Sequence, residues 1–274
     1  MKRLIKILVV LILFIVLILL YSRFIGTKGI KVKEYTIKNK NITDEYYGLK
    51  IVHITDIHYG RITHEKELNK LVEKVNKTKP DIIVFTGDLI DKDYKITSEE
   101  TDKISSILSK MNASIGKYAV NGEHDNISNW NLIIENANFI ILNNSYDKIY
   151  LNNTKYILIS GVDVKSIDLS KTDEILKSKD KPIYSILLIH KPDYIKNIDT
   201  KNYNLILAGH SHNGQIRLPF IGAVSLPKGS KKYYNPHYSI GDTELYISGG
   251  IGCSSYNFRL NNKPSFNLYR LVNK

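Results

Sequence analysis

The chain has 274 residues, a formal net charge of +12 and one cysteine. A single cysteine excludes both an intramolecular disulfide framework and a structural zinc finger built on thiolates. The lysines and arginines are scattered and no aromatic-basic platform accompanies them, so specific nucleic-acid binding is not indicated. An anionic membrane or anionic substrates would suit this charge.

Residues 1–26 are predicted to form an amino-terminal membrane anchor. Positions 7–21 carry no charge, and the flanking Lys6 and Arg23 lie 17 residues apart. A helix of that length spans about 26 Å, which nearly matches a hydrocarbon core of roughly 30 Å. A cleaved signal peptide is the alternative, but the apolar segment ends in Leu20-Tyr21-Ser22, without the small residues of a cleavage site.

The basic residues around this segment predict its orientation. Lys2, Arg3 and Lys6 favour a cytoplasmic amino terminus, although Arg23 and Lys28 on the other side reduce the asymmetry. We therefore expect a single-pass protein of the cell membrane whose folded domain is extracytoplasmic.

The rest of the chain is predicted to be a lead-in segment, 27–47, with one or two edge strands, followed by one α/β domain over 48–274. Apolar residues at helical spacing predict helices over 65–77 and 98–111, and a third that starts near residue 128. Strand–helix alternation in this half indicates βαβ units, whereas the second half is rich in strands. We expect two packed, partly parallel sheets with helices outside.

Five short apolar runs each end in residues that bind metals. Such runs are typical of buried strands, and ligands gather beyond the carboxyl ends of strands in open α/β sheets. These ends are therefore expected to assemble one polar site. The runs are Leu49–His58, Ile82–Asp88, Tyr118–Asp125, Ile186–His190 and Leu205–His212.

The candidate ligands are acidic and imidazole side chains, a mixture that suits Mn, Fe, Zn or Co better than Mg or Ca. Residues two apart in an extended segment point to the same side, so each such pair can hold one metal centre. Seven ligands are too many for one ion but suit two divalent ions bridged by a carboxylate. The seven are Asp56, His58, Asp88, Glu123, His190, His210 and His212.

Two ions about 3.5–4 Å apart would clamp a phosphoryl group and produce hydroxide from water near neutral pH. The leaving oxygen then needs a proton, and His124, next to Glu123, is the natural donor. The predicted chemistry is phosphoester hydrolysis.

These residues resemble the motifs of the calcineurin-like metallophosphoesterase superfamily, which run D-x-H, G-D-x-x-D, G-N-H-D/E, a lone H and G-H-x-H. The resemblance covers about residues 48–272. Residues 209–219 and 245–252 are also similar to the bacterial branch that carries an amino-terminal anchor or signal. The motifs stand here as Asp56-Ile57-His58, Gly87-Asp88-Leu89-Ile90-Asp91, Gly122-Glu123-His124-Asp125, His190 and Gly209-His210-Ser211-His212.

The resemblance implies a four-layer α/β/β/α sandwich of two mixed sheets with flanking helices. It further implies one ion held by Asp56, His58 and His212, and a second held by position 123, His190 and His210, with Asp88 bridging both.

Glu123 departs from the family pattern, which has Asn at this position. A glutamate can still ligate through oxygen but adds a negative charge. We therefore expect it to hold the second ion more firmly and to make that ion a weaker Lewis acid.

Five further residues receive more ordinary interpretations. His53 lies inside an apolar run and is predicted to be a satisfied core residue, while Asp91 and Asp125 are predicted to orient neighbours. Arg217 and Arg259 are possible phosphate contacts, with surface salt bridges as the simpler interpretation.

The sequence thus predicts a membrane-anchored hydrolase of a phosphomonoester, phosphodiester or pyrophosphate bond, dependent on two divalent ions (Mn, Fe or Zn) and acting through metal-activated hydroxide. A lipid-linked or cell-envelope substrate is a hypothesis that rests on the anchor. The alternatives are a nucleotide-lipid pyrophosphatase and a non-catalytic metal-binding membrane scaffold, since specificity resides in loops rather than in the fold.

Overall fold

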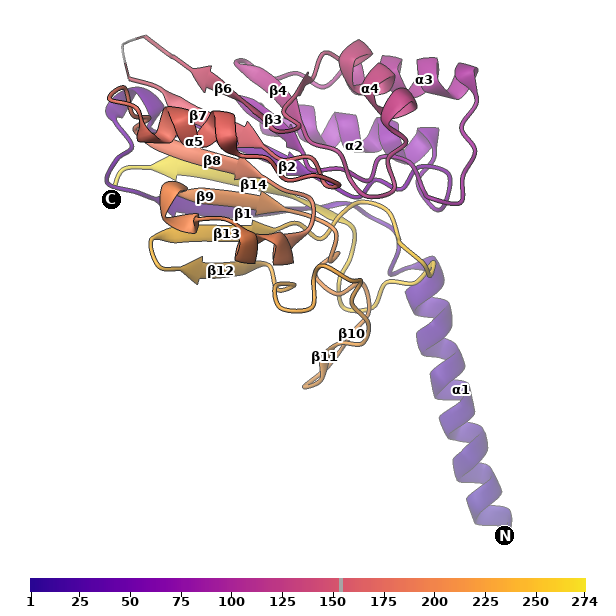
Figure 1. Cartoon of the computed structure of the whole chain (residues 1–274). Coiled ribbons are helices and arrows are strands. Elements are labelled where there is room, and N and C mark those ends of the chain that lie inside the picture. Colours follow the sequence, from indigo (N-terminus) through magenta and orange to yellow (C-terminus); the bar gives the residue numbers. More distant parts are fainter. Residues whose placement is uncertain (153–154) are drawn as a thin grey trace.

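A computed structural model describes residues 1–152 and 155–274, and in this part of the chain two six-stranded sheets pack face to face (Figure 1). The first sheet has the order β1 (Lys31–Lys38), β14 (Ser265–Val272), β2 (Lys50–Ile54), β3 (Ile82–Phe85), β4 (Gly116–Ala119) and β5 (Ile140–Ile141). The second has the order β12 (His237–Ile240), β13 (Thr243–Ile247), β9 (Leu205–Ala208), β8 (Tyr184–Leu188), β7 (Ile157–Gly161) and β6 (Ser145–Ile149).

Both sheets are mixed, as predicted. Strands β2 to β5 run parallel, while β14 is antiparallel to β2 and carries β1 at the edge. In the second sheet β13, β9, β8 and β7 run parallel, and β12 and β6 are antiparallel edges. The central parallel strands β2, β3, β8 and β9 are mainly apolar and almost wholly buried, because each is covered on both faces.

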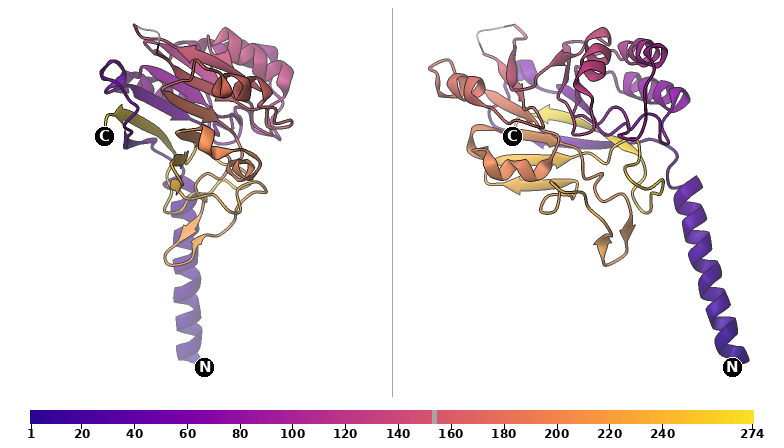
Figure 2. Two further views of the ribbon diagram at one scale, coloured as in Figure 1. Left: turned by 60° about the vertical axis from the view of Figure 1, so that its left-hand side comes forward. Right: turned by 45° about the vertical axis from the view of Figure 1, so that its right-hand side comes forward.

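Helices cover the outer face of each sheet, which confirms the four-layer sandwich (Figures 1 and 2). The first sheet is covered by α2 (Glu65–Thr78), α3 (Ser98–Ser109) and α4 (Ile127–Asn136), and the second by α5 (Ser170–Lys177), η2 (Pro192–Asn197) and η3 (Thr200–Asn202). The three helices predicted from apolar spacing are thus present. Helix α2 buries Leu68, Leu71, Val72 and Val75, the residues on which its prediction depended.

Two elements project from this body. Helix α1 (Lys2–Phe24) is exposed along its length except near its end, where Ser22 is buried and its carbonyl accepts the Arg259 N–H at 3.0 Å. By length and composition, α1 is suited to cross a membrane. A small hairpin of β10 (Arg217–Leu218) and β11 (Gly222–Ala223) leaves the body on the side from which α1 leaves it (Figures 1 and 2). The short η1 (Asp44–Tyr46) lies between β1 and β2.

Candidate metal centre

The candidate ligands meet where the carboxyl ends of β2, β3, β8 and β9 come together between the two sheets. Several of them have a positive φ, which is uncommon for residues other than glycine and concentrates at functional sites. These turns direct side chains back toward a common point immediately beyond each strand. The residues are Asp56 (φ 51°), His58 (45°), Asp88 (58°), His210 (64°) and His212 (50°).

The first cluster consists of Asp56, His58 and His212, whose ligand atoms lie within 4.8 Å of one another. The Asp56 Oδ1 atom lies 3.6 Å from His212 Nε2 and 3.8 Å from His58 Nε2. Its other oxygen, Oδ2, accepts the Thr55 hydroxyl at 2.8 Å and the His210 N–H at 2.9 Å. One carboxylate oxygen is thus held by the protein, and the other is free to bind a cation.

The second cluster consists of Asp88, His190 and His210, within the same 4.8 Å. Asp88 Oδ2 lies 3.3 Å from His190 Nε2 and 3.7 Å from His58 Nε2, so this oxygen stands between the two clusters. One ring nitrogen of each histidine in this cluster is hydrogen-bonded to a backbone carbonyl. His190 Nδ1 is bonded to the Thr86 carbonyl at 2.7 Å, and His210 Nε2 is bonded to the Lys228 carbonyl at 2.8 Å.

These atoms fit a pair of divalent cations. Among the described residues, Asp56 Oδ1 and His190 Nε2 are buried without a hydrogen-bond partner, an arrangement that costs free energy unless something else pairs with them. A Cβ on Gly122 would lie 2.2 Å from Asp88 Oδ1, so glycine is required for this close approach. Mixed carboxylate and imidazole donors match Mn, Fe or Zn.

The pKa values show that the pocket favours a cation. Burial should raise the pKa of Asp88, but His190 and His58 hold it well below the ordinary value. Burial alone would lower the pKa of His190, yet Asp88 and Asp56 raise it to about 9. The negative charge of the carboxylates favours a proton on His190, and the same charge would attract a metal ion to this position.

His212 and His210 are kept neutral instead. Burial, and then the nearby Arg259 charge, lower the pKa of His212 to about 3, although Asp56 opposes this. Burial and the neighbouring His190 lower the pKa of His210 to about 4. A neutral imidazole is the form that binds metal.

Glu123 lies beside the second cluster, and its carboxylate forms an ion pair with Lys191. Its side chain is 33% exposed, and its Oε1 atom lies 3.7 Å from His124 Nε2. Burial would raise the pKa of Glu123, but the bond to Lys191 and the nearby His210 lower it, so the group is ionised. Its assignment as a ligand stays a prediction, with Lys191 as a competing partner.

His124 lies at the open side of the centre. Its backbone N–H donates to Asp88 Oδ1 at 3.1 Å, and its ring Nε2 lies 3.9 Å from Asp88 Oδ2. The ring is 20% exposed, in contrast to the buried ligands. The imidazole therefore can reach both the centre and a molecule that enters from solvent.

The residues predicted to orient neighbours do so. Asp125 accepts the backbone N–H groups of Asp88, Leu89 and Gly122 at 2.7–2.9 Å, which fixes the turn after β3. Asp91 lies 3.7 Å from His58 Nδ1 and is held by Arg61 through two bonds of 2.6 and 3.1 Å.

His53 is also a satisfied core residue, as predicted. It is fully buried, with Nε2 bonded to the Thr86 hydroxyl at 2.8 Å.

Arg259 was not recognised from the sequence for the role it has. Its salt-bridge interpretation is wrong, because the side chain is fully buried and its guanidinium donates to the carbonyls of Gly249, Gly250 and Gly252. Its Nη2 atom lies 3.1 Å from His212 Nδ1, so the arginine supports the back of the first cluster. Arg217 likewise contacts the Asn213 carbonyl and the Asn235 side chain instead of an acid.

The calcineurin-like phosphoesterase family model matches residues 49–214 of the chain, which include all the residues of both clusters. The chain belongs to this family. It is accordingly a hydrolase of phosphate esters that depends on metal ions.

Among its relatives is an uncharacterized metallophosphoesterase, YkuE of Bacillus subtilis, which is 31% identical over 255 residues, covering 92% of this chain and 88% of the relative. The phosphodiesterase YaeI of Escherichia coli is 26% identical over 200 residues, covering 71% of each chain. The structure of the NAD nucleotidase NadN of Haemophilus influenzae has a TM-score of 0.50 and 16% identity, covering 74% of this chain and 45% of that one. This last similarity supports the fold alone.

Proposed function

We infer that the chain is a membrane-anchored phosphoesterase with a dinuclear metal centre, which hydrolyses a phosphomonoester, phosphodiester or pyrophosphate bond. The observation that carries this proposal is the pair of clusters, Asp56–His58–His212 and Asp88–His190–His210, with an Asp88 oxygen between them. Divalent ions at these clusters would supply an activated water molecule and neutralise charge on the phosphoryl oxygens.

The chain's own residues account for the remaining requirements. His124 lies on the exposed side of the clusters, where its Nε2 is placed to give a proton to the leaving oxygen. Asp125 and Asp91 hold the Asp88 turn and His58 in position, so the site does not have to reorganise when a substrate binds.

A lysine-lined cavity supports an anionic substrate. A cavity of about 600 Å³ begins at Glu123 and Lys191 beside the second cluster. Its other cationic residues are Lys196, Lys228 and Lys231. Such a surface attracts phosphate groups and raises their local concentration.

Helix α1 supports a location at the membrane. Its length and apolar composition favour a single pass through the cell membrane, and the basic residues Lys2, Arg3 and Lys6 favour an extracytoplasmic catalytic domain. A domain held at a bilayer would meet lipid-linked phosphates or a cell-envelope polymer, and we propose these as substrate classes.

The proposal is tested with the full chain purified in detergent. Metal analysis should give two ions per chain, and a phosphate-release screen with Mn should give hydrolysis of aryl phosphates or diesters that is reduced in His124→Ala. Two bound ions without hydrolysis of any ester would favour the metal-binding scaffold. A second panel compares phospholipids, nucleotide-linked lipids and soluble esters, and cleavage of soluble esters alone would contradict a lipid-linked substrate.

A further inference from the structure

The β10–β11 hairpin exposes an apolar tip that the phosphoesterase chemistry does not require. The exposed fractions are 38% for Leu218, 109% for Phe220, 72% for Ile221 and 54% for Val224. Phe220 also has a φ of 64°, an unusual conformation for an aromatic residue, and it is fully exposed at the turn. Adjacent exposed apolar side chains of this size mark an interaction surface.

The base of the hairpin is firmly held, so the tip has a defined direction. Gln215 donates to the carbonyls of Tyr256 and Phe258 at 2.6 and 2.8 Å. The Arg217 N–H donates to the Leu260 carbonyl at 3.0 Å. The hairpin is therefore bound to one segment, residues 252–262, which we call the tether loop.

The tether loop also holds the end of α1. The Arg259 N–H donates to the Ser22 carbonyl at 3.0 Å, and a Cβ on Gly26 would lie only 1.9 Å from the Arg259 carbonyl oxygen. The helix and the hairpin thus share one support. In every view the hairpin extends in the same general direction as α1 (Figures 1 and 2).

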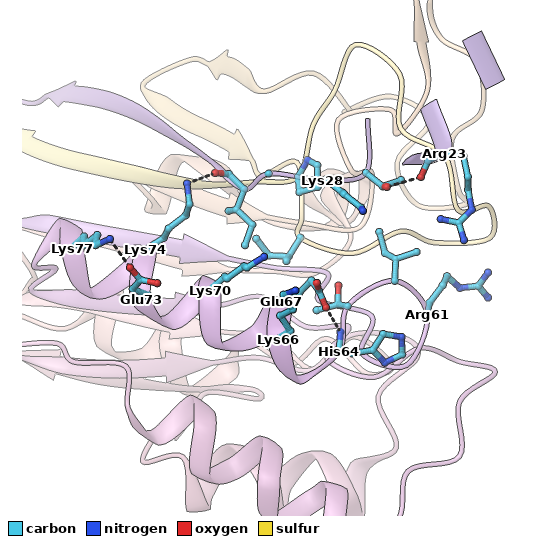
Figure 3. Close-up of a pocket in the computed structure, with 17 residues that line it drawn as sticks. Arg23, Lys28, Arg61, His64, Lys66, Glu67, Lys70, Glu73, Lys74 and Lys77 are labelled. Carbon is cyan, nitrogen blue, oxygen red and sulfur yellow. Dashed lines mark hydrogen bonds and ion pairs between the residues drawn. The ribbon is translucent and has the colours of Figure 1, made fainter. Parts of the chain in front are cut away.

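The same end of the molecule carries cations suited to lipid headgroups. A cavity of about 500 Å³ lies between the end of α1 and helix α2. Figure 3 shows basic side chains from the end of α1 and from α2 that line this cavity. Lys28, Lys66 and Lys70 form no side-chain hydrogen bond or ion pair with any residue that the structure describes. Unpaired cations beside a membrane-spanning helix attract anionic headgroups.

We propose that the hairpin tip, Leu218 to Val224, inserts into the bilayer that α1 spans and so holds the His212 side of the metal centre close to the lipid surface. The proposal rests on the membrane anchor of the proposed function. The occupant is lipid because the tip extends beside a membrane-spanning helix from a common support. The base of the hairpin contributes Gln215, Ile216 and Leu226 to a cavity of about 120 Å³ that contains His212. Insertion would therefore place this cavity, beside the first cluster, near the membrane.

The test uses the full chain in vesicles of phosphatidylethanolamine and phosphatidylglycerol. Phe220→Cys and Ile221→Cys each carry a polarity-sensitive fluorophore, and the lipids carry a quencher on the acyl chain near the glycerol. Cys253 is fully buried, so the parent chain serves as the labelling control. The matched site is Lys179→Cys, which is exposed and precedes β8, at the end of the sheets opposite the metal centre. Unchanged hydrolysis of a soluble aryl phosphate verifies that the labelled chains are folded.

We expect the lipid quencher to reduce emission about twofold or more at positions 220 and 221, because an inserted apolar tip lies ~5–10 Å into the headgroup–acyl boundary. The emission of a fluorophore at position 179 should not change when the quencher is present. Unquenched probes at both tip positions, in a chain that resists alkaline extraction, would overturn the hairpin proposal while leaving the anchor intact. Energy transfer between tip probes of different chains without lipid quenching would overturn it in favour of a second copy. Alkaline extraction of the chain would refute the anchor, and the hairpin proposal with it.

Discussion

The two ligand clusters use the same residue types but differ in what surrounds them. The first, Asp56–His58–His212, has the buried Arg259 behind His212 and the Arg61–Asp91 pair beside His58. The second, Asp88–His190–His210, lies beside the partly exposed residues Glu123 and His124. The first cluster is therefore fixed on its outer side by protein, and the second faces the entrance.

This difference suggests a division of roles. The first cluster borders a cavity of about 120 Å³, whereas Glu123, beside the second, lines one of about 600 Å³. An ion at the first cluster would be retained by a rigid surround, and an ion at the second would exchange and meet substrate more readily. The following predictions test that distinction, beginning with the residue that the two clusters share.

The largest effect is expected for Asp88→Asn. The substitution keeps the shape of the side chain but removes the charge between the clusters. We expect turnover to fall on the order of 10³-fold, equivalent to about 4 kcal/mol at 1.36 kcal/mol per factor of ten. Both ions should bind more weakly, so that metal analysis finds fewer than two ions per chain. Asp180→Asn, an exposed carboxylate, is the matched control. Loss of one ion alone would show that Asp88 belongs to a single cluster.

His124→Ala should reduce turnover by about 10²- to 10³-fold while both ions remain bound, because the residue is placed to act on the leaving group rather than on the metals. The deficit should be largest for alkyl leaving groups, which need a proton, and smaller for nitrophenolate. His237→Ala, at an exposed edge strand, is the control. An equal deficit for all leaving groups would exclude the role as proton donor.

The buried His53 should make the stability of the fold depend on pH. It is linked to the second cluster through Thr86, whose hydroxyl contacts His53 and whose carbonyl is bonded to His190. Burial lowers the pKa of His53 from 6.5 to about 3, so the folded state keeps it neutral. Below pH 6.5 the unfolded chain binds a proton that the folded chain does not, and stability is lost as the pH falls toward 3. At pH 5 the free energy of unfolding is lower by about 2 kcal/mol for this reason.

The measurement is urea unfolding of the metal-free chain in detergent at pH 7 and pH 5. His53→Gln should lose less stability than the parent over this interval, and His237→Gln should resemble the parent. Identical pH dependence in His53→Gln would show that other groups account for the loss.

The smallest effect concerns Glu123 and Lys191. Glu123→Asn should lower the affinity for the second ion about tenfold. Lys191→Met releases the Glu123 carboxylate from its ion pair and should raise that affinity by a similar factor. Turnover per loaded centre should change in the opposite direction. Competition with a chelator measures both affinities, and the first ion serves as the internal control. If neither substitution changes the second affinity, Glu123 is not a ligand.

The sequence predicted the parts of this molecule that depend on local pattern. The strand ends and their Asp and His residues were identifiable because apolar runs are short and the ligands follow them directly. Helix α2 was identifiable from Leu68, Leu71, Val72 and Val75, since their spacing matches one buried face.

Contacts between distant segments could not be predicted. The Glu123–Lys191 pair joins loops after β4 and β8, and its formation depends on the packing of one sheet against the other. Arg259 has the sequence context of a surface arginine, yet it is buried and donates to the backbone carbonyls of Gly249 and Gly252. The exposed hairpin tip was missed for a similar reason: an apolar Leu-Pro-Phe-Ile segment is typical of a core until its location is known.

Each cluster takes ligands from both sheets: Asp56 and His58 follow β2 while His212 follows β9, and Asp88 follows β3 while His190 and His210 follow β8 and β9. Ions bound there would cross-link the two halves of the sandwich in addition to serving the reaction. Scarcity of metal would then loosen the domain and expose it to proteases, and the abundance of the protein would follow the metal supply.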